Sequence, residues 1–182
     1  MEYVTLGKTG LRVSRVGFGG IPIQRVDAAA ARELLDAVRA AGINYIDTAR
    51  GYTVSEELIG QAIEGCRKDF VLATKSMSRD RDSMARDIGI SLGNLRTDYI
   101  DLYQVHNPSP EQLEQVCAPG GALEALLSHL GLTEADGAGF SSLGLSGDGM
   151  AWRFQRTEDG TVYAVPLDGG EITQEPAAEQ AE

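Results

Sequence analysis

The sequence predicts an α/β protein built as a partial (β/α)8 barrel of the TIM type. Three short apolar runs, each typical of a buried parallel strand, end at a polar residue: Asp47, Lys75 or His106. These residues are 28 and 31 positions apart, and a strand with its crossover helix takes about 30 residues. Right-handed crossovers bring successive strand ends to one side of the sheet, where such a barrel builds its site.

The first elements can be assigned from turn and capping residues. Residues 3–6 and 11–14 flank a glycine-bounded turn and are expected to form an N-terminal β-hairpin. Residues 16–19 follow as the first core strand. Asp27 is expected to cap a helix that ends at Gly42, because carboxylates favour helix N-termini and glycine favours the position after the C-terminus.

The pattern then repeats. Residues 43–47 are the second core strand, and Thr53 and Glu56 have the spacing of a capping box for the next helix. Residues 70–74 are the third core strand. The remaining expected elements are a helix over 80–95, a strand over 99–105 and a helix from 110 towards 130 that is interrupted at 119–121.

Four βα units are legible, and residues 139–142 predict a short fifth strand. A complete barrel typically has about 250 residues, so the chain is expected to be truncated relative to one. Residues 131–182 hold ten acidic and two basic residues, against 17 and 14 in the first 130. We therefore expect a half-barrel over 1–130 and a divergent, acidic, Gly-rich tail over 131–182.

Within that tail, alternation predicts a β-hairpin over 152–165, and the composition from Asp168 onward predicts disorder.

Composition excludes several classes of function. The net charge of −11 does not favour binding to nucleic acid or to an anionic membrane surface. No apolar stretch approaches the ~20 residues of a membrane span, and the N-terminus does not resemble a signal peptide. Cys66 and Cys117 make neither a disulfide framework nor a C-x-x-C pair. A cytoplasmic setting is expected, and no metal site.

The chemistry is expected at the strand ends. Asp47, Tyr52, Lys75 and His106 would bring together a carboxylate, a phenol, an ammonium and an imidazole, which make a proton-donating site.

Seven segments in register resemble the aldo-keto reductase superfamily, and the resemblance covers roughly residues 3–127. They are 6–11, 17–20, 47–52, 55–60, 73–75, 98–103 and 105–106. The resemblance implies a (β/α)8 barrel and NADPH-dependent interconversion of carbonyls and alcohols. It is nearest to a bacterial subgroup that often carries C-terminal iron–sulfur cysteines, which are absent here.

The same resemblance implies roles for the four residues. Tyr52 would be the general acid; because a free phenol titrates near ~10, an adjacent ammonium that favours the phenolate would help it donate. Lys75 would supply that ammonium, held by an ion pair with Asp47. His106 would orient and polarise the substrate carbonyl, and the nicotinamide would supply hydride.

The cofactor pocket is assigned by resemblance as well. Gly20 and Ile21, with Asp47, correspond to positions that line it. Ser141 and Ser142 correspond to a polar pair that holds the carboxamide. The Lys and Arg groups that grip the phosphates in the family have no counterpart after residue 130, where only Arg153 and Arg156 occur, in a different context.

Two functions remain open at this point. The first is an aldo-keto reductase-type oxidoreductase that reduces a small aldehyde or ketone with NADPH, or else NADH. The alternative is a catalytically inactive half-barrel: a pseudoenzyme, an assembly partner or a frame-shifted fragment. Either way, a half-barrel has two open, apolar sheet edges, which predict a homo-oligomer.

Overall fold

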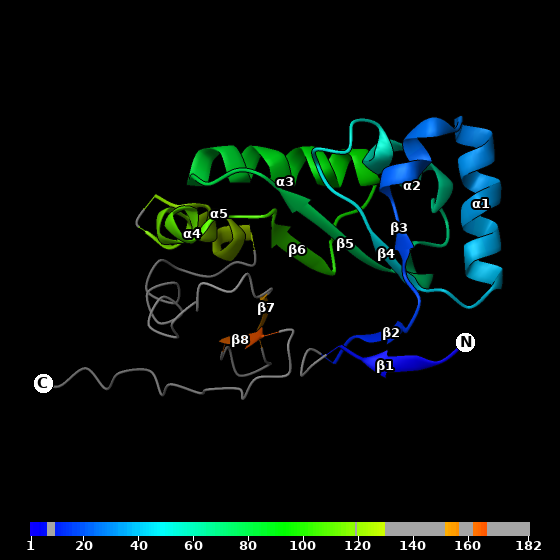
Figure 1. Ribbon diagram of the computed structural model, residues 1–182, viewed down its shortest axis with the longest axis horizontal. Coiled ribbons are helices and arrows are strands. Elements are labelled where there is room, and N and C mark those ends of the chain that lie inside the picture. Colours follow the sequence, from blue (N-terminus) through cyan, green and yellow to red (C-terminus); the bar gives the residue numbers. More distant parts are fainter. Residues whose placement is uncertain (7–9, 119, 130–151, 157–161, 167–182) are drawn as a thin grey trace, which may run out of the picture.

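The computed structural model describes residues 1–6, 10–118, 120–129, 152–156 and 162–166. Its centre is a four-stranded parallel sheet with strand order β3-β4-β5-β6. The helices α1, α2 and α3 cover one face of this sheet (Figure 1). The predicted α/β class is confirmed, and each of the four parallel strands is followed by a helix.

The strands are β1 (Tyr3–Thr5), β2 (Arg12–Ser14), β3 (Phe18–Gly19), β4 (Tyr45–Asp47), β5 (Val71–Ser76), β6 (Leu102–Val105), β7 (Trp152–Arg156) and β8 (Val162–Pro166). The α-helices are α1 (Ala28–Ala40), α2 (Ser55–Ala62), α3 (Arg81–Leu95), α4 (Pro110–Cys117) and α5 (Ala122–His129). Two short 3-10 helices, η1 (Ile21–Arg25) and η2 (Arg67–Asp69), lie in the connections.

The N-terminal hairpin is confirmed. β1 and β2 pair antiparallel, with Tyr3 opposite Ser14. The Tyr3 hydroxyl donates to Gly42 O at 2.7 Å, and Ser14 N donates to Asn44 Oδ1 at 2.7 Å. These bonds fasten the hairpin to the loop before β4, so that it is anchored near the N-terminal end of the parallel sheet.

The expected ends of α1 are also confirmed. The Asp27 carboxylate accepts a hydrogen bond from Ala30 N at 2.9 Å and so satisfies a free N–H of the first turn. Gly42 follows the helix with φ of 78°, a left-handed conformation that glycine adopts without steric cost.

The capping box expected at Thr53 and Glu56 is wrong. The N-cap of α2 is Val54, which makes no side-chain cap. Thr53 has φ of 40°, and its hydroxyl donates to Gln24 instead. Glu56 is 1% exposed and accepts a hydrogen bond from Thr74 in β5. The carboxylate therefore points into the protein, where it cannot reach back to the helix N-terminus.

The core forms where α1 and α2 pack on the sheet. One buried cluster joins α1, the α2 region and the strands, and it includes Leu35, Val38, Ile46, Ile59, Ile63 and Leu72. A Cβ added at Gly60 would lie 2.3 Å from Asn94 O, so this glycine allows α2 and α3 to approach closely.

A second buried cluster joins α3, α4 and α5, and it includes Met84, Ile88, Val116 and Leu123. The interruption predicted between α4 and α5 is confirmed. At this break Arg81 N donates to Gly120 O at 2.8 Å, which ties the start of α3 to the α4–α5 connection.

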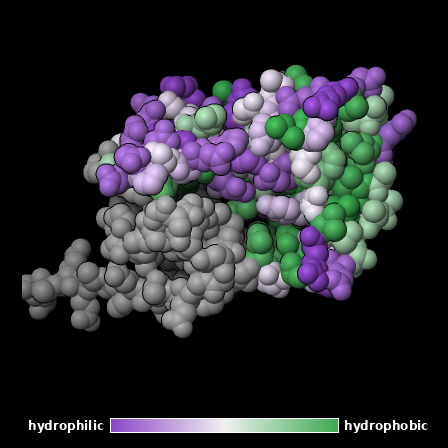
Figure 2. All heavy atoms as spheres, viewed as in Figure 1, coloured by the Kyte–Doolittle hydropathy of each residue, from purple (hydrophilic) through white to green (hydrophobic). Residues whose placement is uncertain are grey.

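Figure 2 shows hydrophilic residues over α3 and hydrophobic residues gathered towards the α1 end of the molecule. At that end α1 exposes Leu34 and β1 exposes Val4, at 41% and 42%. No helix in the described part of the chain is long and apolar enough to cross a membrane.

The hairpin expected over 152–165 is confirmed as an antiparallel pair of β7 and β8, with Trp152 opposite Pro166. The fifth strand expected at 139–142 and the segment from Asp168 lie outside the described residues.

Candidate active site

The four predicted site residues lie at one end of the parallel sheet. Asp47 is the last residue of β4, and Tyr52 lies in the loop that follows it. Lys75 is near the end of β5, and His106 comes directly after β6. Parallel pairing of β4, β5 and β6 aligns these ends, so the chain brings all four side chains to one region.

Lys75 holds the centre of the cluster. Its Nζ donates to Asp47 Oδ2 at 2.6 Å and to Thr48 O at 2.7 Å. The Lys75 residue is 9% exposed, whereas the Asp47 side chain is 36% exposed. The ion pair thus satisfies a nearly buried ammonium and still leaves part of the carboxylate accessible.

Tyr52 and His106 complete the arrangement. Lys75 Nζ lies 5.2 Å from the centroid of the Tyr52 ring. The Tyr52 and His106 rings meet edge to face, with centroids 5.8 Å apart and planes at 84°. The Tyr52 ring therefore lies near both a cation and an imidazole.

Both polar backbone groups of His106 are hydrogen-bonded. His106 N donates to Ser76 O at 2.7 Å, and Arg79 Nη2 donates to His106 O at 2.7 Å. Burial, and next the positive charge of Lys75, lower the pKa of His106 below its ordinary value of 6.5. The imidazole is therefore neutral at neutral pH and can donate one N–H hydrogen bond.

The residues assigned to the cofactor pocket have different positions. Gly20 N donates to Asp47 O at 2.7 Å, and Gly20 O accepts from Ser55 Oγ at 2.8 Å. A Cβ at Gly20 would lie 2.9 Å from Ser55 Oγ, so a larger residue would disturb this contact. Ile21 begins η1 and is 55% exposed. Ser141 and Ser142 lie outside the described residues.

Sequence reasoning missed a buried acid beside this site. Glu56 accepts from Thr74 Oγ1 at 2.8 Å, and its Oε2 lies 3.8 Å from Arg50 Nη1. A signal was available in the sequence, since Glu56 precedes Ile59 and Ile63 by three and seven positions. That spacing puts it on the buried stripe of α2.

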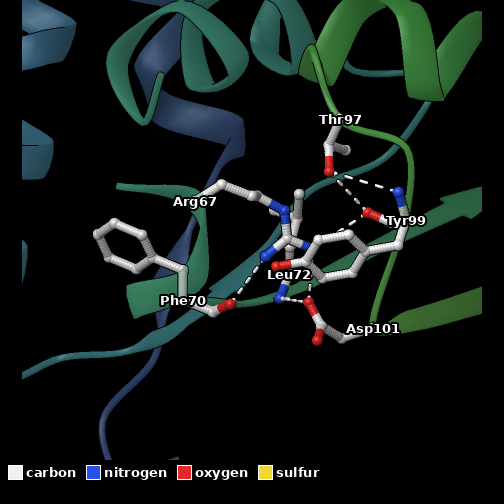
Figure 3. A network of polar contacts seen from close by, with 6 residues as sticks. All are labelled: Arg67, Phe70, Leu72, Thr97, Tyr99 and Asp101. Carbon is white, nitrogen blue, oxygen red and sulfur yellow. Dashed lines mark hydrogen bonds and ion pairs between the residues drawn. The ribbon is translucent and has the colours of Figure 1, made fainter. Parts of the chain in front are cut away.

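A polar cluster near the start of β5 is built around Arg67 (Figure 3). Its guanidinium donates to Phe70 O, Tyr99 O and Asp101 Oδ2, at 2.8, 3.1 and 2.6 Å. Leu72 N donates to the same Asp101 oxygen at 2.8 Å. Because the cluster lies away from the end that carries Lys75, its role is structural.

Within the described residues, no group of three or more His, Cys, Asp or Glu side chains is arranged to hold a metal ion.

Comparison with known proteins gives independent evidence for the family of this chain. Residues 15–158 match the Aldo/keto reductase family. The chain is 37% identical over 129 residues to Aldo-keto reductase YhdN of Bacillus subtilis (strain 168), covering 60% of this chain and 39% of YhdN. It is 30% identical over 180 residues to L-galactose dehydrogenase of Arabidopsis thaliana, covering 91% of this chain and 55% of that protein.

A solved structure of an aldo-keto reductase resembles the fold of this chain. The holo form of aldo-keto reductase AKR11C1 from Bacillus halodurans matches with a TM-score of 0.62 and 34% identity, over 70% of this chain and 47% of that one. The chain thus spans about half the length of the relatives that it matches. Because the match to the family takes in residues 15–158 of the 182, the chain belongs to the aldo/keto reductase family, a family of oxidoreductases.

Proposed function

We propose that this chain carries the proton-donating end of an NADPH-dependent reductase of small aldehydes and ketones. The observation that supports this most strongly is the contact set around Lys75, which lies 2.6 Å from Asp47 Oδ2 and 5.2 Å from the Tyr52 ring centroid.

The four side chains divide the work of carbonyl reduction. Tyr52 donates a proton to the carbonyl oxygen, and the Lys75 ammonium stabilises the phenolate that remains. Asp47 holds that ammonium in place. His106, neutral because its pKa is lowered by burial and by Lys75, donates a hydrogen bond that orients and polarises the carbonyl without losing its proton.

The donor set at this end fits the reactive part of a nicotinamide cofactor. Asp47, 36% exposed at its side chain, lies beside Gly20 and Ile21 at the end of β3. These three residues would hold the nicotinamide. When it is bound, the reduced ring supplies the hydride, and this chain's residues supply the proton and the orientation.

The loops at this end also favour a substrate with an apolar substituent. Ile21 and Met77 follow β3 and β5, and their exposed fractions are 55% and 66%. Val54, two residues after Tyr52, is 42% exposed. Apolar surface in the loops after parallel strands is available to a ligand rather than to the core.

The test is NADPH consumption with a set of aldehydes and ketones, at millimolar cofactor, by the wild type and by Tyr52→Phe. The variant should lose about 10²- to 10⁴-fold in turnover, with little change in carbonyl KM, because only proton donation is removed. Tyr99→Phe is the matched control, since Tyr99 belongs to the Arg67 cluster. Undiminished turnover in Tyr52→Phe would exclude Tyr52 as the acid, and inactive wild type would favour an inactive half-barrel.

A further inference from the structure

We propose that Glu56 is a positioning residue, which holds the loop carrying Tyr52 in place against β5. This inference rests on the proposed function, because it concerns the residue that donates the proton there. The loop comprises residues 48–55 and is called the Tyr52 loop below.

The Tyr52 loop is closed across its base by two side-chain pairs. The Thr48 and Ser55 hydroxyls lie 2.8 Å apart, and both residues are fully buried. Glu56, directly after the loop, is paired with Arg50 inside it at 3.8 Å. Both pairs join the outgoing arm of the loop to the incoming one, with Tyr52 between them.

Glu56 also links the loop to the strand that carries Lys75. One oxygen of its carboxylate accepts from Thr74 Oγ1 at 2.8 Å, and Thr74 directly precedes Lys75 in β5. Arg50 reaches the same strand through its backbone, since Arg50 N donates to Lys75 O at 2.8 Å. One carboxylate therefore ties both the loop and the strand whose side chains must meet.

A third element holds Glu56 itself. Asn94 Nδ2, from α3, donates to Glu56 Oε2 at 3.3 Å. The close approach that this needs is permitted by Gly60, where a Cβ would lie 2.3 Å from Asn94 O. Glu56 is consequently held by Thr74 in β5 and Asn94 in α3, in addition to its ion pair with Arg50 in the loop.

The backbone of the Tyr52 loop needs such restraint. Thr53, next to Tyr52, has φ of 40°, a conformation that is costly for a β-branched residue and persists only when its surroundings enforce it. Thr53 and Val54 are both exposed, so packing against the core does not enforce it. The hydrogen bond from the Thr53 hydroxyl to Gln24 and the two pairs at the loop base restrain it instead.

Stability alone does not account for a carboxylate here. Burying a charge costs desolvation, and apolar residues of similar volume often serve a core as well or better. Glu56 is 1% exposed on a helix face that otherwise buries Ile59 and Ala62. A charge at this position is explained by the need to hold Arg50 and Thr74 at the same time.

The experiment compares Glu56→Gln with Glu57→Gln in the full chain. Glu57 is exposed in the same first turn of α2, so it controls for loss of one negative charge near the helix N-terminus. The first readout is the NMR cross-relaxation between the ring protons of Tyr52 and His106, whose rings meet edge to face. The second is the split of carbonyl reduction into kcat and KM.

We expect Glu56→Gln to lose the Tyr52–His106 cross-peak while Glu57→Gln keeps it. Where the wild type turns over, kcat should fall about 10- to 100-fold with carbonyl KM little changed, because misplacing a reacting group by about 1 Å has effects of this size. An unchanged cross-peak in folded Glu56→Gln would overturn the inference, as would absence of the cross-peak from the wild type.

The two proposals can fail separately. A wild type that shows the cross-peak but reduces no carbonyl contradicts the proposed function, and Glu56 is then judged by the cross-peak alone. If circular dichroism shows that Glu56→Gln does not fold, Arg50→Met breaks the same pair from its 30% exposed partner. Retention of the cross-peak in that variant would overturn the inference.

Discussion

Replacing Asp101 by alanine should destabilise the fold strongly. One Asp101 oxygen accepts from Leu72 N at 2.8 Å and from Arg67 Nη2 at 2.6 Å, and the two side chains of this ion pair are 18% and 12% exposed. Leu72 is fully buried, so its N–H would be left unpaired at a cost of about 1–3 kcal/mol. Arg67 keeps two carbonyl acceptors, so its loss is smaller, about 1 kcal/mol. Together these give about 3 kcal/mol.

Asp101→Asn separates the two contributions. The amide oxygen can still accept from Leu72 N, so this variant should lose only the charge on the Arg67 contact, about 1 kcal/mol. Asp98→Asn, at an exposed position nearby, should stay within about 0.5 kcal/mol of the wild type. Urea unfolding followed by far-UV circular dichroism gives these free energies. The reasoning is refuted if Asp101→Ala unfolds within about 0.5 kcal/mol of wild type, or if Asn is as damaging as Ala.

Two further predictions concern the site. Burial, and next the charge of Lys75, lower the pKa of His106 below 6.5, so just below that pH the folded chain binds fewer protons than the unfolded chain. The free energy of unfolding that comes from this difference is therefore lost as the pH falls below 6.5. An imidazole NMR titration of His129→Gln, which leaves His106 as the sole histidine, checks it; a midpoint at or above 6.5 would contradict the prediction. Calorimetric titration of the 182-residue chain should give an NADPH dissociation constant no tighter than high micromolar, since residues 131–182 set ten acids against Arg153 and Arg156. A low-micromolar constant, about −8 kcal/mol, would contradict this and indicate that a second copy or the tail completes the phosphate site.

The parallel strands were predictable because their apolar residues are continuous along the chain, whereas their ends were not. The third core strand was expected to stop at residue 74, but β5 continues through Lys75 to Ser76. Both polar residues are tolerated inside the strand because each has a partner: Lys75 pairs with Asp47, and the Ser76 hydroxyl bonds to Asp87 in α3. A pattern that treats polar residues as strand ends cannot anticipate partners that lie elsewhere in the sequence.

The meeting of Asp47, Lys75 and His106 was predictable for a related reason. Each of the three residues ends or follows an apolar run, and their spacing matches one strand and crossover helix per step. Right-handed crossovers then place these strand ends on the same side of the sheet. Tyr52 is different, because it lies in the loop after β4, so its nearness to a strand end suggested it as a site residue and the resemblance assigned its role. The contacts of Thr48, Arg50 and Ser55 in its loop follow no periodic pattern that the sequence would reveal.

Glu56 shows why local motifs mislead near such a site. Thr53 and Glu56 satisfy the spacing of a capping box, in which both side chains turn towards the helix N-terminus. Glu56 also lies three and seven residues before Ile59 and Ile63, and that spacing turns it towards the sheet. Only one orientation is available to a single side chain. The buried orientation is favoured because Thr74 and Asn94 both donate hydrogen bonds to the carboxylate there. In a capping box the carboxylate would accept from only one backbone N–H. Glu56, an acid on the buried stripe of a helix beside the Tyr52 loop, is therefore better interpreted as an internal tie than as a cap.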